Sequence, residues 1–122
     1  MIQAIGLDLV EVNRLRTSLE RFGERFRNRV FTPRECSYCE RHADPVIHFA
    51  ARFAAKEATM KALGTGWGQG VEWKQIEVVS EGDAPSLSLT GRAREICGAC
   101  RIHVSLTHTE TIAAAVVILE RA

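Results

Sequence analysis

The sequence lacks a strong excess of charge of either sign, a long apolar run and any internal repeat. Its 122 residues carry 16 basic and 15 acidic side chains, a formal net charge of +1, so the chain as a whole shows no electrostatic preference for nucleic acids or membranes. The first apolar run has no basic leader before it and meets Asp8 and Glu11 within a few residues, far short of a membrane span. We therefore expect a soluble, cytoplasmic protein.

Linkers and low-complexity tracts are also missing, and 46% of the residues are hydrophobic. A chain of this length can bury one ordinary core, so we expect a single domain over residues 1–122. The order of apolar patterns predicts an α+β fold, with an N-terminal strand, then helices, then mainly antiparallel strands.

Local signals delimit the expected elements. Thr32-Pro33-Arg34-Glu35 has the pattern of a capping box, Asp44-Pro45 opens the longest helix, and Gly23 weakens the middle of the first helix. The last strand is continuously apolar, so we expect it to be covered on both faces. The predicted elements are a strand at 2–10, helices near 15–26, 33–42 and 46–63, strands at 73–80 and 86–89 joined by a turn at 81–85, a short helix from Thr90 to about 98, and a hairpin of 101–107 and 112–119.

The four cysteines form two Cys-x-x-Cys pairs, Cys36/Cys39 and Cys97/Cys100. In a chain without a secretion signal this spacing argues against structural disulfides. One alternative is a zinc-stabilised binding module with four thiolate ligands. The 57 residues between the pairs exceed the spacing of common zinc ribbons, and the first pair falls within a predicted helix. Cysteine as a small buried hydrophobic residue is the favoured interpretation.

Two carboxylates occupy positions that suit apolar residues. Asp8 is a lone acid in the first strand, and Glu57 falls with Lys56 on the apolar arc of the long helix. Buried charges are costly unless they are paired or bind a metal, and two carboxylates with no histidine or thiolate nearby suit a hard cation such as Mg²⁺. The ordinary alternatives are a surface pair between Glu57 and Lys61, and a strand-end cap by Asp8.

Two further polar features have ordinary explanations. His103, Ser105 and Thr107 alternate with apolar residues in a predicted strand, so they share one face, which solvent would explain equally well. The glycine-rich stretch 64–70 follows a helix, whereas phosphate-binding loops precede one. It therefore predicts a C-cap and a turn.

Arginines are concentrated between residues 14 and 34, where seven arginines face two acids, a local net charge of +5. On an ideal helix Arg14, Arg21 and Arg25 fall within roughly 20° of a common line. A solvated face is the usual explanation of such a run. The shortage of acids between these arginines favours a surface for an acidic partner.

Three stretches together resemble the holo-acyl-carrier-protein synthases, the short single-domain branch of the 4′-phosphopantetheinyl transferases. Their order and spacing match over almost the whole chain. The stretches are Gly6-Leu7-Asp8 with Glu11 and Arg14, Arg52 to Ala58 leading through Lys61-Ala62 to Gly64-Thr65-Gly66, and His103 to Thr109.

The resemblance implies a transferase that moves the phosphopantetheine arm of coenzyme A onto a serine of an acyl carrier protein, releases 3′,5′-ADP and supports fatty acid biosynthesis. It implies that Asp8 and Glu57 hold Mg²⁺ against the coenzyme A pyrophosphate. Lys61 would contact phosphate, and Glu57 would be the base for the serine proton. Intact Asp8, Glu57 and Lys61 argue against a protein that only binds carrier protein or coenzyme A.

The resemblance also implies partners and an assembly. The carrier protein would present its acidic helix to Arg14, Arg21 and Arg25. Members of this branch form homotrimers whose pockets are shared between neighbouring subunits. The residues implied to line the coenzyme A pocket are Arg52, Lys61, Gly64, Thr65, His103, Ser105 and Thr107.

Overall fold

A computed structural model describes residues 1–66, 68–80, 82 and 84–121. It has the α+β order expected from the sequence. The elements are β1 (Ile2–Glu11), α1 (Val12–Val30), α2 (Pro33–Glu40), α3 (Pro45–Leu63), the 3₁₀ helix η1 (Trp73–Gln75), β2 (Ile76–Val79), β3 (Ser86–Leu89), α4 (Gly91–Cys97), β4 (Arg101–His108) and β5 (Ile112–Glu120).

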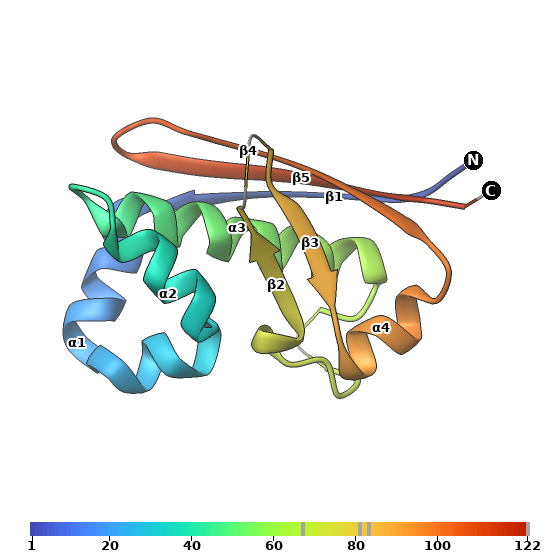
Figure 1. The fold of residues 1–122 in the computed structure, drawn as a ribbon, viewed down its shortest axis with the longest axis horizontal. Coiled ribbons are helices and arrows are strands. Elements are labelled where there is room, and N and C mark those ends of the chain that lie inside the picture. The colour runs from blue at the N-terminus through green and yellow to red at the C-terminus, as the bar shows by residue number, and fades with distance from the viewer. Residues whose placement is uncertain (67, 81, 83, 122) are drawn as a thin grey trace.

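The main sheet has three antiparallel strands in the order β1-β5-β4, so that the last strand is central. Helix α3 lies along one face of this sheet, and the small β2-β3 sheet and the other helices lie beyond α3 (Figure 1). The sheet therefore has an inner face, turned to α3, and an outer face that no element of the described chain covers.

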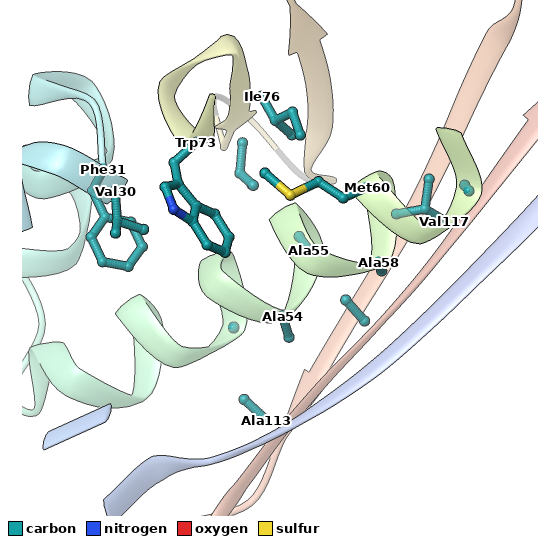
Figure 2. Close-up of a cluster of buried hydrophobic side chains, with 14 of the residues drawn as sticks. Val30, Phe31, Ala54, Ala55, Ala58, Met60, Trp73, Ile76, Ala113 and Val117 are labelled. Carbon is teal, nitrogen blue, oxygen red and sulfur yellow. The ribbon is translucent and has the colours of Figure 1, made fainter. Parts of the chain in front are cut away.

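Helix α3 is held at both ends by the expected caps. The Asp44 carboxylate accepts a hydrogen bond from the Val46 backbone amide, and Gly64 takes the left-handed conformation, with φ of 77°, that ends the helix. Alanines, including Ala54, Ala58 and Ala113, line the seam between α3 and the sheet (Figure 2). Small side chains allow a close approach of helix and sheet, while Phe31, Trp73 and Met60 fill the other side of α3.

Strand β1 approaches α3 so closely that only glycine fits at position 6. A Cβ on Gly6 would lie 1.8 Å from the carbonyl oxygen of Ala58 and 3.1 Å from the amide nitrogen of Ala62. Because side chains alternate along a strand, Asp8 points to the same inner face as Gly6. The close contact therefore brings the Asp8 carboxylate up against α3.

A buried ion pair joins α2, α3 and β2. The Lys56 ammonium lies 2.8 Å from Oε1 of Glu35, both side chains have no exposed surface, and Lys56 also donates to the backbone carbonyl of Trp73, 3.1 Å away. Glu35 accepts from the backbone amide of Val78, 2.8 Å away, and takes part in the predicted capping box with Thr32. Lys56 is thus a satisfied core residue, which accounts for its place on the apolar arc.

Two expectations about secondary structure were wrong. Residues 73–75 form a 3₁₀ helix instead of extending β2: the amide of Ile76 donates to the carbonyl of Trp73, and the Gln75 side chain accepts from the amide of Glu72. Gly23, with φ of 57° and ψ of −136°, divides α1 into two helical segments, so it interrupts the helix that it was expected only to weaken. Thr90 precedes α4 as predicted, but its side chain makes no capping hydrogen bond. The predicted turn at 81–85 includes residues 81 and 83, which lie outside the described residues.

The expectation that β5 is covered on both faces was also wrong within one chain. Val117 and Leu119 are buried against α3, while alternate residues such as Val116 are only half-buried. On the same outer face, Ile5, Leu7 and Leu9 of β1 are 60%, 61% and 67% exposed. The apolar character of these strands is therefore not explained by the core of a single chain.

The close contact at Gly6 generates a stability prediction. Gly6→Ala should lower the free energy of unfolding by about 2 kcal/mol or more, because overpacking forces β1 away from α3. Gly68→Ala is the matched control, since a Cβ there has only one neighbour within 4 Å, at 3.9 Å. Urea denaturation of both variants measures the effect, and equal stabilities would contradict the proposed steric role of Gly6.

Candidate active site

Three of the residues singled out from the sequence meet where β1 crosses α3. The Lys61 ammonium lies 2.9 Å from Oδ1 of Asp8 and 3.0 Å from the carbonyl oxygen of Leu7. Glu57 stands one helical turn before Lys61, close enough to Asp8 for the Asp8 carboxylate to raise the pKa of Glu57. Two carboxylates and one ammonium therefore share a small, half-buried site.

The electrostatics of this site are unbalanced. Burial raises the pKa of Glu57, and the neighbouring Asp8 carboxylate raises it further, while Lys61 acts in the opposite direction. Asp8 is only 8% exposed, and its Oδ2 atom is buried with no hydrogen-bond partner in the described part of the chain. The two carboxylates thus have more negative charge and more acceptor capacity than Lys61 alone satisfies.

These residues fit a hard divalent cation. The partnerless Oδ2 of Asp8 and the carboxylate of Glu57 are oxygen donors of the kind that Mg²⁺ prefers, and Mg²⁺ commonly uses one or two carboxylates with water and phosphate oxygens. Within the described ranges, no three side chains among His, Cys, Asp and Glu gather into a complete metal cage. Water and a ligand would have to supply the remaining oxygens.

The lack of a three-ligand cluster among the described residues also bears on the alternative of a zinc site with four cysteine ligands. Cys36 and Cys39 lie on α2, Cys97 ends α4 and Cys100 precedes β4. All four are free thiols, and no cluster of three potential ligands occurs among the residues that the structure describes. Burial raises the pKa of Cys39 to about 12, which suits a structural core residue more than a thiolate ligand. The structure does not bring the two pairs together.

A pocket of about 320 Å³ opens beside the carboxylates. It is lined by Glu57 and Phe53 of α3, Glu11 of β1, and Arg14 and Phe26 of α1, among others. Arg14, which the sequence placed on a partner surface, and Glu57, which it placed at the metal, thus share one cavity.

Arg52 lies in a second pocket, of about 210 Å³. Its guanidinium lies 4.0 Å from the centre of the Tyr38 ring and donates to Oγ of Ser80, and its Nε is buried without a partner in the described chain. His48 and His108 line the same pocket, and burial lowers the pKa of His48 to about 4.

Sequence reasoning assigned no role to Tyr38, His48 or His108. The only signal was that His108 belongs to the third matching stretch. Tyr38 and His48 come from α2 and α3, and no spacing in the sequence indicates that these helices bring them beside Arg52.

The polar row on β4 is not brought to the carboxylates. His103, Ser105 and Thr107 pair across β5 with Ile118, Val116 and Ala114, which places them on the outer face of the sheet. Asp8 is on the inner face, and the His103 ring hydrogen-bonds the Glu120 carboxylate at 2.9 Å. One chain alone therefore cannot place this row and Asp8 in the same pocket.

The remaining candidates lie at the two ends of the site. Gly64 caps α3 directly after Leu63, and the amide of Thr65 donates to the carbonyl of Met60. Arg14, Arg21 and Arg25 are exposed on α1, but the break at Gly23 separates Arg25 from the other two, so the single straight stripe was wrong.

The class of enzyme to which this chain belongs follows from its similarity to known proteins. The model of the 4′-phosphopantetheinyl transferase superfamily matches residues 4–117. The chain belongs to this superfamily.

None of the helices in the described ranges combines the length and apolar character that a membrane span needs.

Within this class, the similar curated proteins are holo-[acyl-carrier-protein] synthases. The protein of Koribacter versatilis is 49% identical over 98% of this chain and 99% of its own length, and that of Solibacter usitatus is 48% identical over the same shares. The Bacillus anthracis synthase in complex with CoA (3′,5′-ADP) superposes with a TM-score of 0.83 at 33% identity, over 100% of this chain and 99% of that one. The Helicobacter pylori synthase in complex with coenzyme A has a TM-score of 0.84 at 28% identity, over 95% and 99%. These matches confirm the resemblance, the α+β fold and the transferase class.

The unbalanced charge at Glu57 predicts a pH-dependent effect on stability. A carboxyl whose pKa is raised by folding destabilises the fold when it is ionised, and this cost disappears as the pH falls through that pKa. Without added metal, Glu57→Gln should therefore raise the melting temperature at pH 8, and the gain should shrink toward pH 4.

Thermal unfolding of Glu57→Gln and the parent protein between pH 4 and pH 8 measures this effect. Glu110→Gln, at an exposed residue of the β4-β5 turn, is the control and should show no such trend. A lower melting temperature for Glu57→Gln at pH 8 would contradict the assignment of Glu57 as a strained carboxylate.

Proposed function

We propose that residues 1–122 form a single Mg²⁺-dependent transferase domain that moves 4′-phosphopantetheine from coenzyme A to a serine of apo-acyl carrier protein. The observation that carries the proposal is the meeting of Asp8, Glu57 and Lys61 where β1 crosses α3. The relatives named holo-[acyl-carrier-protein] synthase, and the solved relatives with coenzyme A bound, support the same reaction. We place the protein in the cytoplasm, in fatty acid biosynthesis.

In this reaction the serine oxygen forms a bond to the β-phosphorus of coenzyme A. The bond from that phosphorus to the oxygen bridging to the α-phosphate breaks, and 3′,5′-ADP leaves with the electron pair. Asp8 and Glu57 would hold Mg²⁺, which supplies positive charge for the developing negative charge on the phosphate oxygens. Lys61 donates hydrogen bonds to the same phosphates.

Glu57 is the base we assign to the serine proton, taken directly or through a water molecule. A carboxylate is a suitable acceptor for a hydroxyl proton, and Glu57 stands beside Asp8 at the site assigned to the metal. Glu57 also lines the 320 Å³ pocket, which is open to a serine arriving from solvent.

We propose that the carrier protein binds to the exposed arginines of α1. An acidic helix lying over Arg14, Arg21 and Arg25 would meet positive charge on both sides of the break at Gly23. Because Arg14 lines the pocket that contains Glu57, a carrier docked on this surface would present its serine next to the base.

The coenzyme A contacts implied by the resemblance would lie on both sides of the carboxylates along α3, since Gly64 and Thr65 follow Lys61 and Arg52 precedes Glu57. The partnerless Nε of Arg52 and its nearly complete burial suit an anionic or planar group of the nucleotide. His103, Ser105 and Thr107, which lie on the outer face, can join a coenzyme A pocket only across a subunit boundary.

A homotrimer with shared pockets agrees with the outer face of the sheet. Ile5, Leu7 and Leu9 are each at least 60% exposed, and half-buried Val116 and Ile118 lie beside them on β5. Contiguous apolar surface of this kind is typical of protein interfaces. The assembly would cover it and bring the β4 polar row to a neighbouring subunit.

Intact-mass spectrometry of apo-acyl carrier protein tests the reaction. With coenzyme A and Mg²⁺, the carrier should gain one phosphopantetheine, and Glu57→Gln should lower the rate by about 100-fold or more, as expected for loss of a base and metal ligand. Glu110→Gln should react normally. No mass gain with several apo carriers, or normal turnover by Glu57→Gln, would contradict the proposal.

Light scattering tests the assembly. The parent protein should have the mass of three chains, and Ile5→Glu should shift it toward a monomer because a charge on the outer face opposes burial. Ser37→Glu, at an exposed position on α2, is the control. A monomeric parent protein would contradict the proposal that neighbouring subunits cover the exposed apolar face.

A further inference from the structure

We infer that Lys61 is an internal cation that occupies the carboxylate site until a phosphate draws it away, so that the divalent ion and the coenzyme A pyrophosphate bind cooperatively. The inference rests on the proposed function and extends it from the identity of the ligands to the coupling between them.

The first observation is the place of the ammonium. Nζ of Lys61 lies 2.9 Å from Oδ1 of Asp8, while Oδ2 of the same carboxylate has no partner in the described chain. An ion bound by Asp8 would therefore meet a competing cation on the neighbouring oxygen. With both cations in place, the three positive charges would exceed the two negative charges of Asp8 and Glu57.

The second observation is the difference in exposure between the two side chains. The Asp8 side chain is 9% exposed and is fixed on β1 against α3, whereas the Lys61 side chain is 54% exposed at the last turn of the helix. Lys61 can therefore turn outward while Asp8 cannot. The carbonyl of Leu7, 3.0 Å from Nζ, holds the ammonium in the inward position when no other acceptor is present.

A pyrophosphate changes this balance because it is both an acceptor for the ammonium and a source of oxygens for the ion. When Lys61 turns to the phosphate, Oδ1 of Asp8 is released and the excess positive charge is offset. Each ligand then raises the affinity for the other by the same factor, as linkage requires. We expect coupling of about 10-fold, within the usual range for two linked sites.

Binding of Mn²⁺, a paramagnetic substitute for Mg²⁺, measures the coupling by electron paramagnetic resonance of the free ion. Without coenzyme A, Lys61→Met should bind Mn²⁺ about 10-fold more tightly than the parent protein, because the competing charge is gone. With coenzyme A present, the parent protein should gain affinity for Mn²⁺, and Lys61→Met should gain less, because only direct coordination by the phosphate oxygens remains. Lys74→Met, at an exposed lysine on η1, should behave as the parent.

Two further variants serve as controls for this interpretation. Lys61→Gln repeats the charge removal with a polar side chain, and Lys61→Met combined with Asp8→Asn should lose the tight Mn²⁺ binding if it arises at Asp8. Equal or weaker Mn²⁺ binding by both Lys61 variants without coenzyme A would overturn the inference. So would equal coenzyme A coupling in the parent and the variants. If only the transfer assay fails, the proposed function is contradicted. The Mn²⁺ titration without coenzyme A still decides whether Lys61 competes with the ion.

Discussion

The close contact between Gly6 and the backbone of α3 is the constraint on which the rest of the site depends. It sets the distance between the sheet and the helix, and alanines along the seam keep that distance short over the length of α3. Asp8 follows two residues later on the same face, so its carboxylate is carried to Glu57 and Lys61 by the main chain. The charged groups meet because the fold forces them together at a cost in electrostatic energy.

Two neighbouring residues of α3 show how differently the fold treats buried charge. Lys56 is enclosed, ion-paired with Glu35 and bonded to backbone carbonyls, so its charge is satisfied within the chain. Glu57, about 100° further round the helix, faces a second carboxylate, and burial raises its pKa. The first arrangement stabilises a tertiary junction, whereas the second leaves a demand for positive charge that a ligand can meet.

The helices, the strands and the central site residues could be predicted from the sequence because each has a local sequence pattern. A capping box marked α2, and charges out of place in apolar patterns marked Asp8, Glu57 and Lys56. The pocket at Arg52 could not be predicted, because its lining joins α2, α3 and the end of β4 through tertiary packing alone. The outer face was misjudged for a related reason: an apolar strand pattern indicates that a face will be covered, but not whether the same chain covers it.

The opposite tasks of Lys56 and Glu57 make α3 intolerant of length changes. Deleting or inserting one residue between Pro45 and Lys56 would turn the following helix by about 100° relative to its caps. A deletion would put Glu57 at the position of Lys56, in the pocket built around Glu35, where two acids would be enclosed without a counterion. An insertion would put Lys56 at the position of Glu57, facing Asp8. Natural variation in this protein should therefore consist of length changes in surface loops and of substitutions along α3. A one-residue insertion or deletion within the helix should prevent folding, whatever its effect on catalysis.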